Sequence, residues 1–297
     1  MSDVDRERVA ANGLTFECLR RGEGDRLALC LHGFPDDAGT MRPLLDRLAA
    51  AGFTAVAPYM RGYGPTDPAP DGDYTTVAMA KDAAALADTL GDGEAVLVGH
   101  DWGAAGAYAA AAIAPERFSH LVALAVPPRF VELFPEHPRQ WLRSWYIVFF
   151  QLPAVPERVI RARDFAFIEL LWNTWSPTWD YPDGRLEAVK ETFRESGTVE
   201  AALTYYRQFG RQATGKLADD AIDRRFPADN GDGSGGGIEV PALVVAGKED
   251  GCIGHELFDD ADEAFARCRC LKLPGAGHFL HQERPDVVAD EIRSFVD

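Results

Sequence analysis

The stretch that most constrains the fold of this chain is Gly99-His100-Asp101-Trp102-Gly103. The mostly apolar residues 94–98 before it predict a buried strand, and the alanine-rich residues 103–114 predict a helix. Where a strand turns directly into a helix, the residue at the turn is strained, and glycines two positions away on either side avoid a clash. The pattern therefore predicts that Asp101 lies at the carboxyl end of a strand, at a helix N-terminus that favours negative charge.

Two interpretations of Asp101 fit this stretch when it is taken alone. The pattern Gly-x-nucleophile-x-Gly would make Asp101 a reactive group at the position where a serine usually stands. Alternatively, Asp101 only caps the following helix. Because short glycine motifs are common by chance, the rest of the chain must decide between the two.

Length and composition limit the protein class. With 297 residues the chain can form one large α/β domain with an insertion. No apolar run approaches the roughly 18 residues of a membrane span, and the first residues do not resemble a secretory signal. We therefore expect a cytoplasmic protein, either a monomer or a homodimer. The five cysteines are an odd number, which argues against a disulfide framework, and Cys268 and Cys270 are expected to be buried free thiols.

The chain is strongly acidic, with a formal net charge of −17. Nucleic acid and anionic membrane surfaces are therefore not expected as partners. Only five of the 30 basic residues are lysines, and this bias suggests a halophilic source as a hypothesis. Loss of stability on dialysis into low salt would support that hypothesis, and indifference to salt would count against it.

Strand and helix patterns alternate through the first 128 residues. Asn12-Gly13 is a type I′ hairpin signal between two strand-like runs. Such alternation predicts a mostly parallel sheet flanked by helices. The predicted strands cover residues 27–31, 53–57, 94–98 and 118–126, and the predicted helices cover 41–51, 77–90 and 103–114.

The pattern changes after Pro128. Residues 129–226 show no convincing strand and hold five of the six tryptophans, which predicts an inserted helical lid, or cap. A helical bundle that only packs its own aromatic residues is the alternative. Residues 227–237 are expected to be a flexible, glycine-rich linker. The core, made of residues 1–128, is completed by 238–297, with strands at 240–246 and 270–273 and helices at 254–266 and 286–296.

Three polar residues follow three of the predicted strands. Asp101 comes after one strand, Asp250 after the next-to-last and His278 after the last. In an open parallel sheet the loops at the carboxyl ends of the strands meet at one cleft. The order nucleophile, acid, histidine is that of an α/β-hydrolase.

Further motifs are spread along nearly the whole chain. They are His32-Gly-Phe-Pro35, Arg61-Gly-Tyr-Gly-Pro-Thr66, the 99–103 stretch, Gly247-Lys-Glu-Asp250, Gly277-His278, Ser144-Trp-Tyr-Ile-Val-Phe-Phe-Gln151 and Leu203-Thr-Tyr-Tyr-Arg207. Together they resemble the motifs of epoxide hydrolase-like proteins of the α/β-hydrolase superfamily, whose nucleophile is an aspartate. The resemblance implies the α/β-hydrolase fold with a cap.

A carboxylate nucleophile is already ionised at neutral pH and needs no base to attack an sp³ carbon. The resemblance implies that Asp101 forms an alkyl-enzyme ester and that His278 then activates the water that hydrolyses it. Asp250 would orient His278, as in a serine triad. Glu249 is the rival acid, and the family register favours Asp250.

Further roles follow from the same resemblance. Backbone N–H groups of Phe34 and Trp102 would form the oxyanion hole. The resemblance also suggests that the Phe34–Pro35 peptide bond is cis. Tyr146 and Tyr206 would donate protons to the epoxide oxygen, with Tyr205 as the alternative to Tyr206. Phe34, Trp102, Tyr146 and Tyr206 would also contact the substrate.

We expect hydrolysis of a small, mostly apolar epoxide by water to a vicinal diol, with no cofactor and no metal. The aromatic composition of residues 129–226 motivates the word apolar. A haloalkane dehalogenase shares the aspartate nucleophile and Trp102 and is the first alternative. A non-catalytic binding module on the same fold is the second.

Overall fold

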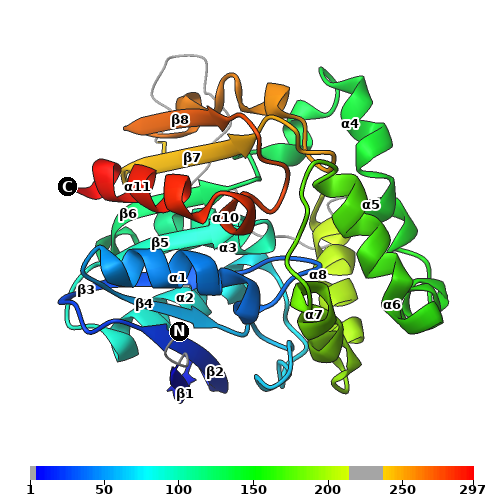
Figure 1. The fold of residues 1–297 in the computed structure, drawn as a ribbon, viewed down its shortest axis with the longest axis horizontal. Helices are drawn as coiled ribbons and strands as arrows, with labels where there is room; N and C mark the ends of the chain where they lie inside the picture. The colour runs from blue at the N-terminus through cyan, green and yellow to red at the C-terminus, as the bar shows by residue number, and fades with distance from the viewer. Residues whose placement is uncertain (1–4, 214–236) are drawn as a thin grey trace.

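The computed structural model describes residues 5–213 and 237–297, and its centre is a single twisted sheet (Figure 1). In this described part the sheet has eight strands in the order β1-β2-β4-β3-β5-β6-β7-β8. Strands β3 to β8 run parallel to one another, and β1 and β2 form an antiparallel edge. The strands are β1 (Asp5–Ala11), β2 (Leu14–Arg21), β3 (Arg26–Leu31), β4 (Phe53–Pro58), β5 (Ala95–His100), β6 (Phe118–Leu124), β7 (Ala242–Gly247) and β8 (Cys268–Leu273). The predicted fold class is thereby confirmed.

The hairpin at the N-terminal edge is the one that the sequence predicted. Asn12 and Gly13 both have positive φ angles, 45° and 75°, as a type I′ turn requires. The turn joins β1 to β2 with Ala11 opposite Leu14.

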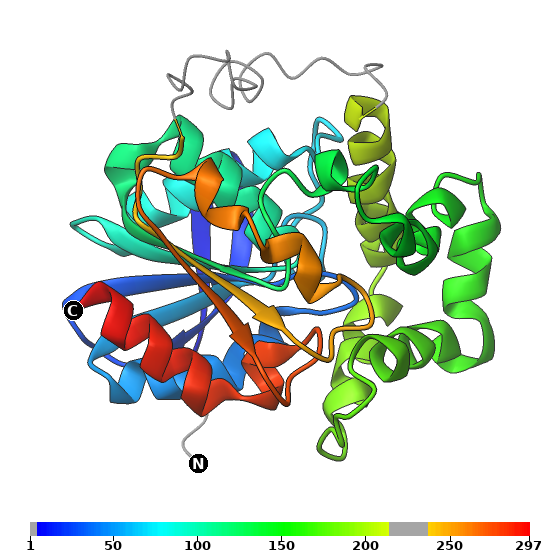
Figure 2. The same ribbon diagram turned by 90° about the horizontal axis from the view of Figure 1, so that it is seen from above.

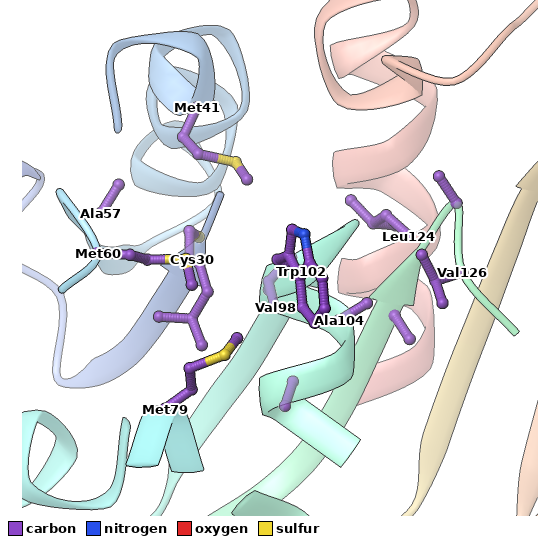
Figure 3. Close-up of a cluster of buried hydrophobic side chains, with 14 of the residues drawn as sticks. Cys30, Met41, Ala57, Met60, Met79, Val98, Trp102, Ala104, Leu124 and Val126 are labelled. Atoms are coloured by element: carbon purple, nitrogen blue, oxygen red, sulfur yellow. The ribbon is translucent and has the colours of Figure 1, made fainter. Parts of the chain in front are cut away.

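Helices cover both faces of the sheet and make a three-layer core. Helices α1 (Arg42–Ala50) and α11 (Pro285–Val296) pack together on one face, and α2 (Thr76–Leu90) and α3 (Trp102–Ile113) pack together on the other (Figure 1). Parallel strands covered on both faces are apolar along their whole length. Accordingly β4 and β5 are buried at every position. Figure 3 shows part of this core, including Cys30, Val98 and Leu124 from three neighbouring strands.

The described residues between β6 and β7 are helical. We call residues 129–213 the helical segment, and Figures 1 and 2 place its helices together at one end of the sheet. The Trp172 indole nitrogen donates to the carbonyl of Pro35 at 2.9 Å, so this segment contacts the loop after β3. Its helices are α4 (Pro138–Arg143), α5 (Trp145–Phe149), α6 (Val155–Trp175), which is broken by non-helical residues at 162–165, α7 (Arg185–Arg194) and α8 (Thr198–Ala213).

Two expectations for the C-terminal part were wrong, and one cannot be examined. Residues 254–266 form two short 3₁₀ helices, His255–Phe258 and Ala261–Ala264, rather than one α-helix. Cys268 is only partly buried and Cys270 is exposed, whereas both were expected to be buried, although all five cysteines are free thiols. The predicted linker 227–237 lies almost entirely outside the described residues. Within the described ranges, no helix combines the length and the apolar character needed to cross a membrane.

Candidate active site

The turn from β5 to α3 holds Asp101 in the strained conformation that the glycine pattern predicted. Asp101 has φ 50° and ψ −114°. A Cβ atom on Gly99 would lie 2.3 Å from the carbonyl oxygen of Gly103, and one on Gly103 would lie 2.3 Å from that of Leu31. Only glycine fits at these two positions, so the backbone itself presents the Asp101 carboxylate at the end of β5.

The side chain of Asp101 does not cap the helix that follows it. It makes no capping hydrogen bond to α3, and its Oδ1 atom accepts from the backbone N–H of Phe34 at 2.8 Å. Gly33 permits this approach, since a Cβ atom there would lie 2.4 Å from Cβ of Asp101. The Phe34–Pro35 bond is cis. The helix-cap interpretation of Asp101 is therefore wrong, and the loop after β3 contacts the carboxylate directly.

Asp250 and His278 meet Asp101 from the ends of β7 and β8. Nδ1 of His278 lies 2.9 Å from Oδ2 of Asp250, and Nε2 lies 3.6 Å from Oδ2 of Asp101. The other oxygen of Asp250 accepts from the backbone N–H groups of Cys252 and Ile253 at 2.7 and 2.9 Å. Because a carboxylate only accepts, Nδ1 of His278 carries a proton and Nε2 faces Asp101.

Glu249, the rival acid, is engaged elsewhere. Its Oε2 atom accepts from the backbone N–H of Ala276 at 3.0 Å. Geometry thus favours Asp250 as the partner of His278.

The charges around His278 determine its protonation. Burial alone would lower its pKa, but the carboxylates of Asp250 and Asp101 outweigh burial and raise the pKa to about 10. All three side chains are buried. In the resting protein at neutral pH, His278 is therefore an imidazolium between two carboxylates.

The loop that carries His278 is supported by residues that sequence reasoning missed. The backbone N–H of His278 donates to the carbonyl of Trp175 at 3.2 Å, and the Trp175 indole lies against the imidazole with ring centroids 5.0 Å apart. Glu283 accepts from Ser176 Oγ at 2.7 Å and from the Gly277 N–H at 2.9 Å. These residues come from α6 and α10 (Leu280–Glu283) or the loops beside them. No local sequence motif identifies them as part of the site.

The predicted tyrosines differ in their surroundings. Tyr146 and Tyr206 both line a cavity with Asp101, and their ring centroids are 5.7 Å apart. The hydroxyl of Tyr206 forms no hydrogen bond of normal geometry with the described residues, although the indole N–H of Trp102 is close enough to act on its pKa. The hydroxyl of Tyr146 lies 3.3 Å from Sγ of Cys252. Tyr205 instead donates to the carbonyl of Arg61 at 2.9 Å and so points away from Asp101. Of the two adjacent tyrosines, Tyr206 is the one at the site.

The cavity above Asp101 is narrow and apolar, with a volume of about 70 Å³. Burial raises the pKa of Tyr146 and of Tyr206 well above the usual value, so both phenols keep their protons at neutral pH. Residues from the core and the helical segment line it together: Asp101, Trp102, Ala105, Val126, Phe130, Tyr146, Ile147, Tyr206, Phe209 and Ile253.

Two buried groups in the described chain bring donor atoms within 4.8 Å of one another, and by residue type either could hold a metal ion. In one, Oδ2 of Asp36 lies 3.2 Å from Nδ1 of His100 and 3.5 Å from Nε2 of His281. The other consists of Asp250, Cys252 and His278, whose side chains already contact one another or Tyr146. The expectation that no metal is needed stays a prediction.

Known proteins share this architecture over almost the whole chain. Residues 29–285 match the family model of the alpha/beta hydrolase fold. The chain is 27% identical over 301 residues to the Bacillus subtilis protein named AB hydrolase superfamily protein YfhM, covering 100% of this chain and 99% of that one. It is 30% identical over 327 residues to Epoxide hydrolase A of Mycobacterium tuberculosis, and the match covers 97% of this chain and 96% of that protein. The crystal structure of Bacillus megaterium epoxide hydrolase with an inhibitor superposes with a TM-score of 0.82 at 24% identity, covering 98% and 99%, which concerns the fold alone.

With its carboxylate at a strand-to-helix turn and a histidine on the last strand's loop, the chain belongs to the α/β-hydrolase fold family. Within that family it is a hydrolase of the epoxide hydrolase type.

Proposed function

We propose that this enzyme hydrolyses apolar epoxides to vicinal diols through an ester of Asp101. The main support is the arrangement around that carboxylate. One oxygen is held by the Phe34 N–H at 2.8 Å, the other faces His278, and two protonated tyrosines line the same cavity. A nucleophile and proton donors around one cavity are what epoxide opening needs.

In the first step the carboxylate of Asp101 attacks an epoxide carbon. The new bond is the ester C–O bond, and the epoxide C–O bond breaks with its electron pair going to oxygen. That oxygen takes a proton from Tyr206 or Tyr146, which leaves a tyrosinate. Because burial holds the pKa of both phenols high, the proton is present before the reaction begins.

In the second step His278 takes a proton from water, and the resulting hydroxide attacks the carbonyl carbon of the ester. Negative charge then develops on the oxygen next to the Phe34 N–H, and Trp102, as the first residue of α3, supplies a second N–H without an intrahelical acceptor. Collapse releases the diol oxygen, which takes the proton from His278. The second proton of the water, left on the carboxyl group, returns to the tyrosinate.

Ester formation itself prepares His278 for this second role. The imidazolium of the resting enzyme cannot act as a base, and Asp101 is one of the two carboxylates that keep it charged. Esterification removes the negative charge of Asp101, so the pKa of His278 falls and the imidazolium releases its extra proton to solvent. The base is thereby released only after the ester that it must hydrolyse has formed. His278 takes up a proton from solvent again once the Asp101 carboxylate is regenerated.

The substrate contacts come from both parts of the chain. We propose that residues 129–226 act as a cap, since Tyr146, Ile147, Tyr206 and Phe209 of the helical segment complete the cavity over Asp101. Apart from the two tyrosine hydroxyls, these side chains are apolar. The proposed substrate is accordingly an epoxide with an apolar substituent.

A single turnover in water enriched in heavy oxygen tests the ester directly. After proteolysis, the peptide that contains Asp101 should carry the heavy isotope, because water attacks the side-chain carbonyl and leaves its oxygen there. The same experiment without epoxide is the control for passive exchange. Label found only in the diol would mean that water attacks the epoxide itself, and the proposal would be wrong.

One observation favours a second candidate, haloalkane dehalogenation by the same aspartate. The indole N–H of Trp102 is buried and belongs to a side chain that lines the cavity, and its nearest acceptor among the described side chains is the hydroxyl of Tyr206, which lines the same cavity. Such a donor could stabilise a departing halide. A panel of haloalkanes and styrene-oxide-like epoxides separates the two, since halide release without diol formation would favour the second candidate.

A further inference from the structure

The contact between Tyr146 and Cys252 joins the helical segment to the loop that holds Asp250. The hydroxyl oxygen of Tyr146 lies 3.3 Å from Sγ of Cys252, and both side chains are buried. Cys252 also donates its backbone N–H to Asp250 at 2.7 Å, so its position is fixed by the same turn that positions the acid. The thiol therefore contacts one of the two cavity tyrosines from a loop whose backbone is bonded to Asp250.

The loop around Cys252 is fastened to the helical segment as well. Nε2 of Gln140, on α4, donates to the carbonyl of Cys252 at 2.8 Å, and its Oε1 accepts from the N–H of Gly254 at 3.0 Å. Both Gln140 atoms engage backbone groups on the two sides of the loop. Movement of the backbone at Cys252 away from Tyr146 would break these bonds, so the loop that carries the thiol is held in place beside Tyr146.

We propose that Cys252 is a positioning residue for the ring-opening step, in which its thiol donates a hydrogen bond to the hydroxyl oxygen of Tyr146 as that phenol gives up its proton. This inference rests on the proposed function. A tyrosinate has only lone pairs to offer, so at that moment the S–H must be the donor whichever group donates at rest. A hydrogen bond to a charged oxygen is stronger than one to a neutral phenol, and it therefore favours the transition state over the ground state.

The proton balance of this step is simple. The Tyr146 proton goes to the epoxide oxygen, the S–H proton stays on sulfur, and no electrons leave the site. Burial raises the pKa of the Cys252 thiol well above its usual value, so the thiol stays protonated and serves as a donor. Among the described residues, Tyr206 has no thiol within hydrogen-bond distance, and its nearest side-chain donor is the indole N–H of Trp102. The two tyrosines therefore have different donors, and only the hydroxyl of Tyr146 contacts the sulfur.

Kinetics in two backgrounds test this dependence. Removing the thiol with Cys252→Ala should slow single-turnover ester formation about 3- to 10-fold when Tyr206→Phe leaves Tyr146 as the only donor, as expected for one lost hydrogen bond. In the Tyr146→Phe background the same change should have no effect on that rate. Cys252→Ser, which keeps a donor, should restore most of the rate. Equal losses in both backgrounds would mean that Cys252 matters only for packing, and the inference would be overturned.

An infrared measurement tests the contact without any substrate. The S–H stretching band of Cys252 is the one that disappears in Cys252→Ala, and it should shift in Tyr146→Phe and stay in place in Tyr206→Phe. Cys18→Ala, which removes another fully buried thiol in the core, is the matched control and should leave both the band and the turnover unchanged. A band that shifts in Tyr206→Phe but not in Tyr146→Phe would overturn the inference. A wild type that opens no epoxide, with the shift intact, would overturn the proposed function instead.

Discussion

Nε2 of His278 lies 3.6 Å from Oδ2 of Asp101, whereas Nδ1 of the same ring lies 2.9 Å from Asp250. The longer distance exceeds that of a normal hydrogen bond, so the imidazole is anchored to Asp250 and only loosely attached to Asp101. That asymmetry suits the role that we propose for Asp101, because the carboxylate would have to leave its counter-ion in order to attack a carbon atom.

Loss of the base should trap the ester. We expect His278→Gln to form a covalent adduct whose mass exceeds that of the protein by the mass of one epoxide, because glutamine cannot take a proton from water. Intact-protein mass spectrometry after mixing with epoxide checks this. The double variant Asp101→Ala, His278→Gln should carry no adduct. Diol production by His278→Gln at the wild-type rate would contradict the two-step scheme.

The pKa of His278 should differ between the free enzyme and the ester. In the free enzyme the two carboxylates raise it to about 10, and ester formation removes one of them. The rate of hydrolysis of the preformed ester should therefore increase with pH and reach a plateau, and the midpoint of the increase should lie below pH 10. A pH–rate profile from single turnovers, compared with an NMR titration of His278 in the free enzyme, measures both. Identical midpoints would show that Asp101 does not control the base.

The two cavity tyrosines should each contribute to ring opening, and Tyr205 should not. We expect Tyr146→Phe and Tyr206→Phe to slow ester formation about 10- to 100-fold each, below the full effect of a general acid because the other phenol remains. Tyr205→Phe is the matched control, since that hydroxyl bonds to the carbonyl of Arg61. Rapid-quench kinetics with a styrene-oxide-like epoxide measure the rate. A loss in Tyr205→Phe as large as that in Tyr206→Phe would reverse the assignment.

A buried carboxyl group near the site should make stability depend on pH. Burial raises the pKa of Asp37 to about 6, although Thr192 and the backbone N–H of Thr40 donate to it. The folded state then holds a proton that the unfolded chain releases near pH 4, so stability falls as pH rises from about 4 to 6. We expect Asp37→Asn to remove up to about 3 kcal/mol of this dependence in urea unfolding. Asp25→Asn, at an exposed position, should leave the profile unchanged, and an unaltered profile in Asp37→Asn would contradict the assignment.

Local steric requirements and strand order made the centre of the site predictable. Gly99 and Gly103 have no tolerance for a side chain, so their spacing identified the turn that holds Asp101. Asp250 and His278 follow parallel strands, and the carboxyl ends of such strands meet. The choice between Tyr205 and Tyr206 needed the structure, because adjacent helical residues point in different directions and the sequence does not say which one faces the core.

Contacts across long sequence separations were not predictable. Cys252 reaches Tyr146 from 106 residues away, and nothing in its own stretch distinguishes it from a packing cysteine. Residues 254–266 have apolar residues at helical spacing, yet the chain makes i to i+3 bonds such as Glu263 to Asp260 instead. Aspartates at 259, 260 and 262 favour such local turns over a continuous helix.

The small volume of the cavity above Asp101 limits how ligands can enter it. About 70 Å³ is room for roughly two water molecules, and sites for organic ligands are usually about 300 Å³ or larger. Rings such as those of Phe130 and Phe209 must therefore move aside before a bulky molecule can enter. Capture then becomes slower than free diffusion and more sensitive to temperature, and discrimination among bulky molecules begins at the entrance, before any bond is broken.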